Sequence, residues 1–144
     1  IRPLAAASIG QVHRALTRDG RDLAIKVQYP GIRRSIDSDV DNVAALLRLS
    51  GLVPRGLDLS PLLAEAKRQL HEEADYTREG ACLTRFGDLL ADRPAFLVPA
   101  LHPDLTTGSV LAMDHVAGHP VEDLAPAPQD QRDRVMTCLI DLMF

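Results

Sequence analysis

The sequence predicts an α+β fold in which an antiparallel sheet of about five strands packs against helices. Three features lead to this prediction. Two strand-like runs separated by a turn lie near the start of the chain, apolar residues at helical spacing follow them, and strand-like runs return after Pro94. The length of 144 residues is that of one ordinary globular domain.

The first strands follow a loop of small residues at 5–10 (AAASIG). Residues 11–16 and 23–27 are the two strands, and Arg18-Asp19-Gly20 is a turn signal between them. Pro30-Gly31 ends the second strand. Because the connection is short, the two strands are expected to pair in the antiparallel sense.

Helices are predicted in the middle of the chain. Apolar residues recur at helical spacing over residues 33–50. After a loop at 51–58, Ser60 is expected to cap a helix and Pro61 to take its first position. One long helix is expected to run from there to about Leu90.

Further along, strands are predicted again at 95–98 and 109–115. Glycine and proline residues indicate a linker at 116–128, and an amphipathic helix begins near Gln129. This helix has no C-terminal cap before residue 144, so we expect it to be cut there. The missing initiator Met likewise indicates an internal piece of a longer protein.

The composition excludes several functional classes. The formal net charge is −4 and only five residues are aromatic, which provides neither a basic surface for nucleic acid nor rings on which bases stack. No apolar run reaches the roughly 18 residues that span a bilayer. Cys82 and Cys138 are too isolated for a disulfide framework, and the glycine and proline beside His115 and His119 argue against a two-His metal face. We therefore expect two reduced thiols and no metal at these positions.

Lys26 is the first candidate for a functional residue because it lies in the apolar strand at 23–27. Burying an unpaired ammonium group is costly, so this side chain is expected to meet a carboxylate, a phosphate or both. The alternative is a lysine at the edge of the sheet, with its ammonium group reaching solvent.

A carboxylate partner for Lys26 is expected on the long helix. Glu79 lies on an otherwise apolar stripe of that helix. The stripe also contains Cys82, Leu83, Phe86 and Leu90. Glu73 lies six residues earlier, about 240° around a straight helix, so the two glutamates cannot both meet one lysine. The alternative is a solvated acidic face made of Glu72, Glu73, Asp75 and Glu79.

Two further segments are consistent with a nucleotide site. The small-residue loop at 5–10 can offer N–H groups to an anion, although alanine also favours a helix. At 110–118 an apolar strand leads into a polar pair and a glycine turn, a pattern that by itself fits any strand leaving a sheet. Loop, strand, turn and a strand with a central lysine follow one another in the order in which protein kinases cover ATP.

Together these segments resemble the UbiB/AarF family of atypical kinases over essentially the whole chain. The motifs that carry the resemblance are Ala5-Ala6-Ala7-Ser8-Ile9-Gly10-Gln11-Val12-His13, Ala24-Ile25-Lys26-Val27-Gln28-Tyr29-Pro30-Gly31, Glu73-Ala74-Asp75-Tyr76-Thr77-Arg78-Glu79 and the run from Val110 to Gly118. The first and third are specific to the family, whereas the other two occur in kinases at large. Alanines replace the usual kinase-loop glycines, and Asp114 stands where a glutamate is more usual. The resemblance implies a kinase-like N-lobe at 1–116, an interlobe linker at 117–128 and the first helix of a helical C-lobe, cut short, at 129–144.

The resemblance also implies roles for the site residues. Lys26 is expected to contact the α- and β-phosphates of ATP and to form the catalytic pair with Glu79. The other expected ATP-binding residues are Ala5, Ala6, Ala7 and Ser8 at the phosphates, the backbone of Asp114 and Val116 at the adenine, and Met113 behind it. Glu73 and Asp75 are expected to face an N-terminal extension with a K-x-G-Q motif, which would precede residue 1. The Mg²⁺ ligands and the catalytic loop would follow residue 144, so this piece alone is not expected to transfer phosphoryl groups.

The function implied by the resemblance is that of the ATP-binding N-terminal half of a UbiB-like atypical kinase or ATPase that supports ubiquinone (isoprenoid lipid) biosynthesis. The alternatives are a non-catalytic nucleotide-binding scaffold of a lipid-biosynthesis complex and a small-molecule phosphotransferase of kinase-like fold. The implied partners are ATP, lipid-biosynthesis proteins and a membrane surface reached through other parts of the protein, but not nucleic acid. The implied location is the cytoplasm or the inner-membrane periphery in a bacterium, and the mitochondrion in a eukaryote.

Overall fold

The computed structural model describes residues 3–51 and 57–143. Its sheet has the strand order β1-β2-β3-β4, and every neighbouring pair is antiparallel. The strands are β1 (Ala5–Ala7), β2 (Gly10–Leu16), β3 (Asp22–Gln28) and β4 (Val110–Asp114). The helices are α1 (Ile32–Leu49), α2 (Ser60–Glu73), α3 (Tyr76–Leu89), the short 3-10 helix η1 (Val121–Leu124) and α4 (Gln129–Met143). The fold is α+β, as the sequence predicts.

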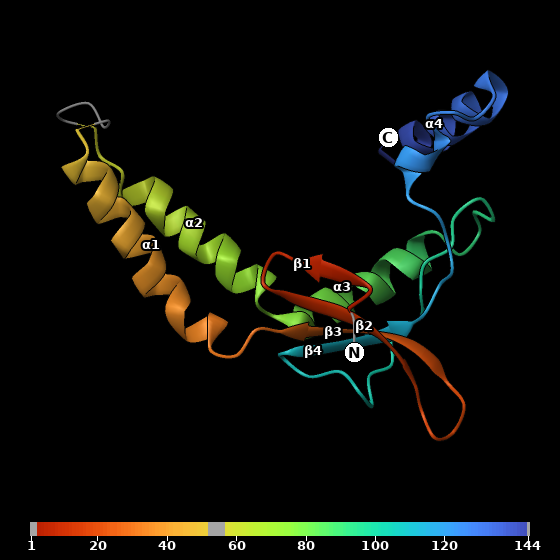
Figure 1. Ribbon diagram of the computed structural model, residues 1–144, viewed down its shortest axis with the longest axis horizontal. Coiled ribbons are helices and arrows are strands. Elements are labelled where there is room, and N and C mark those ends of the chain that lie inside the picture. The colour runs from red at the N-terminus through yellow and green to blue at the C-terminus, as the bar shows by residue number, and fades with distance from the viewer. Residues whose placement is uncertain (1–2, 52–56, 144) are drawn as a thin grey trace.

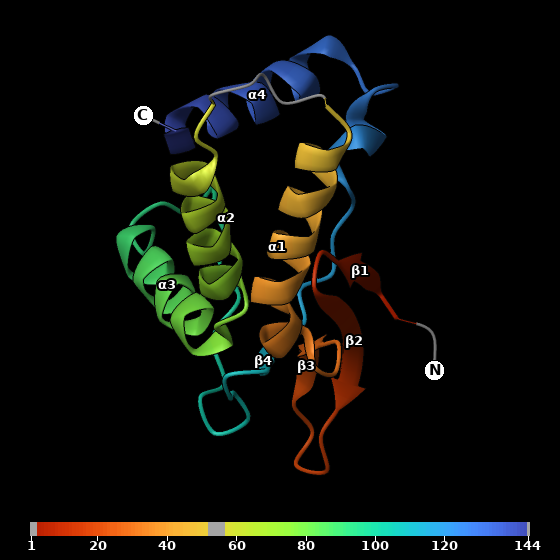
Figure 2. The same ribbon diagram turned by 90° about the vertical axis from the view of Figure 1, so that its left-hand side faces the viewer.

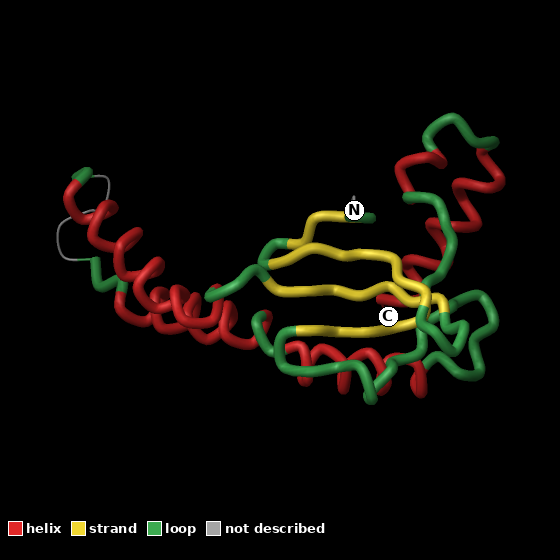
Figure 3. Tube along the Cα trace, turned by 60° about the horizontal axis from the view of Figure 1, so that its bottom comes forward, coloured by secondary structure: helices red, strands yellow, loops and turns green. Residues whose placement is uncertain are grey.

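The helices lie in three places around the sheet. In Figure 1, α1 and α2 form a hairpin that projects from one end of the sheet, while α4 lies at the other end. Figure 2 shows the two helices of the hairpin side by side, with α3 next to α2. In Figure 3, α3 runs along one face of the sheet, where it packs against β4. The core at this junction consists of Ile9, Ile36, Ala74, Tyr76 and Leu111.

The β2–β3 hairpin forms around the predicted turn. Gly20 has a φ of 90°, a left-handed conformation in which a residue with a Cβ would be strained. Its N–H donates to the carbonyl of Thr17 at 3.0 Å, and the N–H of Thr17 donates to the carbonyl of Arg21 at 2.9 Å. This turn sets the register in which Lys26 lies opposite Val12 of β2.

Lys26 lies on an interior strand. Its second neighbour is Leu111 of β4, so β3 is paired along both of its edges. The alternative of a lysine at the edge of the sheet is therefore wrong. A lysine in this position extends from a face of the sheet rather than from its rim.

The prediction of one long helix from Pro61 to Leu90 is wrong. The helix is broken at Ala74 and Asp75, and α3 begins in a new direction at Tyr76. Asp75 has extended backbone angles, and its carboxylate accepts from the N–H groups of Thr77 and Arg78 at 3.1 and 3.4 Å. The chain thus passes from one helix to the next without any glycine or proline, and the short acidic side chain of Asp75 caps the second helix.

The start of α2 also differs from the prediction. Ser60 is the first helical residue and not the cap, and its own N–H donates to the carboxylate of Asp58 at 2.9 Å. Pro61 lies in the first turn, as expected. The loop predicted at 51–58 falls partly on residues 52–56, which lie outside the described residues.

Two strand predictions need correction. The loop predicted at 5–10 is in part the strand β1, which turns at Ser8 and Ile9 into β2. The strand predicted at 95–98 is absent. Among the described residues, the edge of β4 that faces away from β3 has only an isolated bridge, between Leu101 and Met113. Proline at 94, 99 and 103 removes backbone donors along this segment, which explains why a regular strand does not form. The described sheet therefore has four strands instead of about five.

The remaining helices agree with the sequence. The helix predicted at 33–50 is α1, and the helix predicted near Gln129 is α4. The segment predicted as a linker contains η1. Within the described residues, no helix combines the length and the apolar character needed to cross a bilayer.

Candidate functional site

The site is built around an ion pair between the sheet and α3. The Nζ atom of Lys26 lies 2.8 Å from Oε1 and 2.9 Å from Oε2 of Glu79, so both carboxylate oxygens accept from one ammonium group. The lysine side chain is 20% exposed and the glutamate side chain 39% exposed. The pair that the sequence predicts is present, and its ammonium group still reaches the surrounding space.

The break between α2 and α3 is held in place by β3. Gln28 lies two residues after Lys26, on the same face of the strand, and is 8% exposed. Its amide Nε2 donates to the carbonyl of Ala74 at 2.5 Å, in the segment between the two helices. The N–H of Tyr76 donates to the carbonyl of Gly108 at 3.2 Å. These bonds fix the start of α3, and with it the position of Glu79 one turn later.

Sequence reasoning did not single out Gln28. The available signal is its place two residues from Lys26 in a strand that is otherwise apolar on both sides. A buried amide needs partners for its polar atoms, and here the partner is a backbone carbonyl that the helix break leaves free.

A cavity of about 570 Å³ opens next to the ion pair. Its walls come from the β1–β2 turn (Ser8 and Ile9), β3 (Lys26), the end of α2 (Glu72 and Glu73) and the first turns of α3 (Arg78 and Glu79). A volume of this size is within the range of ordinary ligand pockets. The cavity brings together residues from the alanine-rich, lysine and acidic motifs.

The two glutamates at the end of α2 differ in their partners. Glu72 binds Arg68 from its own helix and Arg78 from α3, so it bridges the helix break. The side chain of Glu73 lines the cavity and has no hydrogen-bond or ion-pair partner among the described residues. The alternative, in which Glu72, Glu73, Asp75 and Glu79 form one solvated acidic face, is therefore wrong.

The helix break changes the relation between Glu73 and Glu79. On one straight helix they would face different directions, but both line the same cavity because α3 starts in a new direction. Asp75 is engaged as the cap of α3 and does not line the cavity. Of the two acidic motif residues, Glu73 is the one that faces the open space.

The alanine motif contributes to the cavity only through its turn. Ser8 and Ile9 line the wall, whereas Ala5, Ala6 and Ala7 form β1 and pair with residues 10–12 of β2. The structure does not bring the three alanines to Lys26. The three alanines form β1, the strand that leads into the turn at Ser8 and Ile9.

A second cavity of about 300 Å³ lies behind β4. It is lined by Glu79, Cys82, Leu83, Phe86, Leu111 and Met113. Four of these residues belong to the helical stripe that the sequence predicts, and Met113 of β4 lines the same cavity. The expectation that Met113 lies behind a bound adenine stays a prediction. Glu79 and Cys82 line both this apolar space and the cavity beside Lys26.

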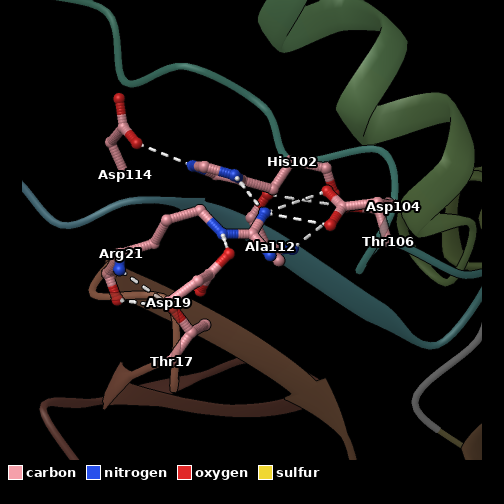
Figure 4. Close-up of polar contacts among 8 residues, drawn as sticks. All are labelled: Thr17, Asp19, Arg21, His102, Asp104, Thr106, Ala112 and Asp114. Carbon is pink, nitrogen blue, oxygen red and sulfur yellow. Dashed lines mark hydrogen bonds and ion pairs between the residues drawn. The ribbon is translucent and has the colours of Figure 1, made fainter.

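The end of β4 is braced by a polar network that sequence reasoning did not find (Figure 4). The N–H of Asp114 donates to the carbonyl of Ala100 at 2.9 Å, and its carboxylate accepts from Nε2 of His102 at 2.7 Å. Nδ1 of His102 lies 3.2 Å from Nη1 of Arg21. Because a guanidinium group only donates, Nδ1 must accept, which places the imidazole proton on Nε2.

Val116, beyond the network, has no backbone hydrogen bond among the described residues.

Arg21 connects this network to the β2–β3 turn. Its Nη1 lies 2.9 Å from a carboxylate oxygen of Asp104, and its Nε lies 3.0 Å from Asp19. The pKa of Asp19 is lowered from its ordinary value, first by a hydrogen bond with Thr17 and then by Arg21. Arg21 and His102 are 81 residues apart, so no local pattern indicates their contact.

An antiparallel sheet whose interior strand carries a lysine paired with a helix glutamate defines a kinase-like N-lobe. The sequence model of the ABC1 atypical kinase-like domain family matches residues 1–144, so the chain belongs to this family. The resemblance to UbiB/AarF atypical kinases is thereby confirmed.

Curated relatives are similar over nearly the whole chain. The atypical kinase coq-8, mitochondrial, of Caenorhabditis elegans is 41% identical over 98% of this chain and 19% of its own length. The atypical kinase COQ8B, mitochondrial, of Rattus norvegicus is 44% identical over 97% of this chain and 26% of its own length. The chain thus spans only 19% to 26% of the length of these relatives.

A solved structure shows the same fold. The complex of Rv3197 with erythromycin from Mycobacterium tuberculosis superposes with a TM-score of 0.74 at 30% sequence identity. The match covers 93% of this chain and 34% of that one. The kinase-like arrangement described above is therefore shared with an experimentally determined relative.

Proposed function

We propose that the chain is the ATP-binding N-terminal half of a UbiB-like atypical kinase or ATPase that supports ubiquinone biosynthesis. The observation that carries the proposal is the Lys26–Glu79 pair on an interior strand, beside a cavity of about 570 Å³. In this proposal residues 1–116 are the N-lobe, 117–128 the linker between lobes and 129–144 the first C-lobe helix.

Lys26 binds the phosphates in this proposal. Its ammonium group has three N–H donors, and two carboxylate oxygens of Glu79 hold it in place while a fifth of the side chain stays exposed. Glu79 thus acts as the orienting group and Lys26 as the phosphate contact. Ser8 lies in the turn at the cavity wall and is the polar residue of the alanine motif that we place at the phosphates, next to the strand formed by Ala5, Ala6 and Ala7.

The adenine end of the proposed site is the segment after β4. The N–H and C=O of Val116 are unpaired among the described residues, so they are open to a planar ligand with a donor and an acceptor on one edge. Asp114 contributes its backbone carbonyl there, because its N–H donates to Ala100 and its side chain is held by His102. Met113 lines the apolar space behind.

Mg²⁺ would neutralise phosphate charge and join the triphosphate to acidic ligands. No group of three or more His, Cys, Asp or Glu side chains among the described residues is arranged to hold a metal ion. In keeping with the resemblance, we assign the Mg²⁺ ligands to residues that would follow residue 144. What this chain supplies is Lys26, in a cavity whose three carboxylates make a metal-accompanied phosphate more favourable than a bare one.

We further propose that Glu73 receives a cationic group from outside this chain, in keeping with the expected K-x-G-Q extension. Its carboxylate is unpaired among the described residues and faces the cavity. Asp75 contributes to this site by shaping the helix break, since its own carboxylate caps α3.

The test is nucleotide binding by the full natural protein that contains this chain. We expect saturable ATP binding in calorimetry with Mg²⁺ present, with ADP competing for the same site. Release of phosphate or transfer to a lipid precursor would identify an enzyme, and binding without turnover would identify the scaffold alternative. Failure to bind either nucleotide would overturn the proposal.

A further inference from the structure

Tyr76 lies directly under the ammonium group of the ion pair. It is the first residue of α3 and its side chain is fully buried, with 0% exposure. The Nζ atom of Lys26 is positioned over its ring, 4.7 Å from the ring centroid. A cation within about 6 Å of an aromatic centroid is attracted by the electron density of the ring face.

The ring and Glu79 act on Lys26 from the same helix. Tyr76 and Glu79 are three residues apart in α3, so their side chains lie on neighbouring positions of one helix face. Lys26 therefore receives a carboxylate on one side and a ring on another. A lysine side chain has four rotatable bonds, and two contacts from a fixed helix restrict them more than one contact does.

Within the described part of the chain, the hydroxyl group of Tyr76 makes no contact that would favour a tyrosine at this position. Its oxygen is buried and has no hydrogen-bond partner among the described residues. Burial, and then the charge of Glu79, raise the pKa of this phenol, so the ring stays neutral at physiological pH. A buried hydroxyl without a partner is unfavourable for stability, which leaves the ring as the useful part of the side chain.

The space for this ring depends on a glycine of the alanine-rich motif. A Cβ atom on Gly10 would lie 3.1 Å from the Tyr76 hydroxyl and 2.2 Å from the carbonyl oxygen of Val27. Gly10 thus allows β2 and β3 to pair closely above the tyrosine. The alanine-rich and acidic motifs meet at this point, one residue from the lysine in β3.

We propose that Tyr76 is a positioning residue for the nucleotide site: its ring holds the Lys26 ammonium in the orientation that pairs with Glu79 and faces the cavity. Tyr76 acts through Lys26 and does not itself line the cavity. The expected effect of Tyr76 on ATP binding rests on the proposed function. The contact between the ring and the ammonium group is independent of that function. The two are therefore tested separately.

The contact is tested by NMR of the full natural protein without nucleotide. Protons on the ε-carbon of Lys26 that lie over an aromatic ring are shifted upfield, and the resonance is assigned by its absence in Lys26→Arg. We expect Tyr76→Phe to keep the upfield shift and Tyr76→Leu to lose it. Ile36→Ala, which also removes buried volume from the same core, is the control for general destabilisation and should keep the shift.

The functional consequence is tested by ATP affinity of the same variants. Tyr76→Leu is expected to weaken ATP binding about fivefold, which corresponds to the free energy of a typical cation–π contact. Tyr76→Phe keeps the aromatic ring and is expected to retain the wild-type affinity. An unshifted Lys26 resonance in the wild type, or loss of the shift in Tyr76→Phe, would overturn the positioning role. If the shift behaves as expected but the wild type binds no ATP, the proposed function fails while the contact stands. If Ile36→Ala weakens ATP binding as much as Tyr76→Leu, Tyr76 is a core residue only and the proposal is wrong.

Discussion

The sequence contains two lysines, and each forms an ion pair of nearly the same length in a different part of the molecule. Lys26 in the sheet lies 2.8 Å from Glu79, and Lys67 in the helical hairpin lies 2.7 Å from Asp41. The distances do not distinguish the two pairs, but their surroundings do. This difference shows why an ion pair alone does not identify a functional site.

The pair in the hairpin is a surface contact. Asp41 is 63% exposed, and water can solvate its carboxylate whether or not the lysine is present. The pair beside the sheet is bidentate, lies over a buried ring and opens into a cavity. We therefore expect the two pairs to respond differently to the loss of one partner.

The largest difference in stability is expected from the two acidic partners. Glu79→Ala should lower the free energy of unfolding by about 1–2 kcal/mol, between the values for exposed and buried pairs, because the ammonium group loses both acceptors in a poorly solvated place. Asp41→Ala should change it by less than about 0.5 kcal/mol. Urea unfolding without nucleotide measures both values.

Glu72 is not a suitable control for that comparison, because Arg68 and Arg78 both bind it across the helix break. Equal losses from Glu79→Ala and Asp41→Ala would show that the Lys26 pair is an ordinary surface contact. That result would remove the distinction between the two regions.

A smaller effect is expected at the helix break. Asp75→Ala should cost about 1 kcal/mol because the first N–H groups of α3 lose their acceptor. Asp75→Asn is the matched control, since asparagine caps helices about as well as aspartate, and it should retain the stability. Thermal unfolding of the two variants gives the comparison. Equal destabilisation by both would mean that the charge of Asp75, and not its capping, stabilises this segment.

The sequence was sufficient for those parts of the site that depend on local patterns. Lys26 is the one charge in the apolar strand at 23–27, and Glu79 is the one charge on the apolar helical stripe from Glu79 to Phe86. Each charge needs a partner, so the two were predicted to pair. Both strands of the β2–β3 hairpin and its turn were predicted for the same reason.

Features that depend on contacts between distant residues were not predicted. The helix break at Asp75 lies in a run without glycine or proline, and the bond from Gln28 to Ala74 that supports it joins residues 46 apart. The Arg21–His102–Asp114 network has no periodic signature at all. The edge strand formed by the three alanines was not predicted either, and their expected contact with the phosphates stays a prediction.

The two lysines offer the most direct test of the central claim, that Lys26 is the phosphate-binding residue of a kinase-like site. ATP affinity should be measured in the full natural protein carrying Lys26→Met or Lys67→Met, with unfolding curves to show that both variants are folded. Each change removes one positive charge from an ion pair and replaces lysine with a side chain of similar length and shape. Our account predicts a loss of at least about tenfold for Lys26→Met, the size of a charged hydrogen bond, and a change within about twofold for Lys67→Met. Equal ATP affinity in the two variants would contradict it.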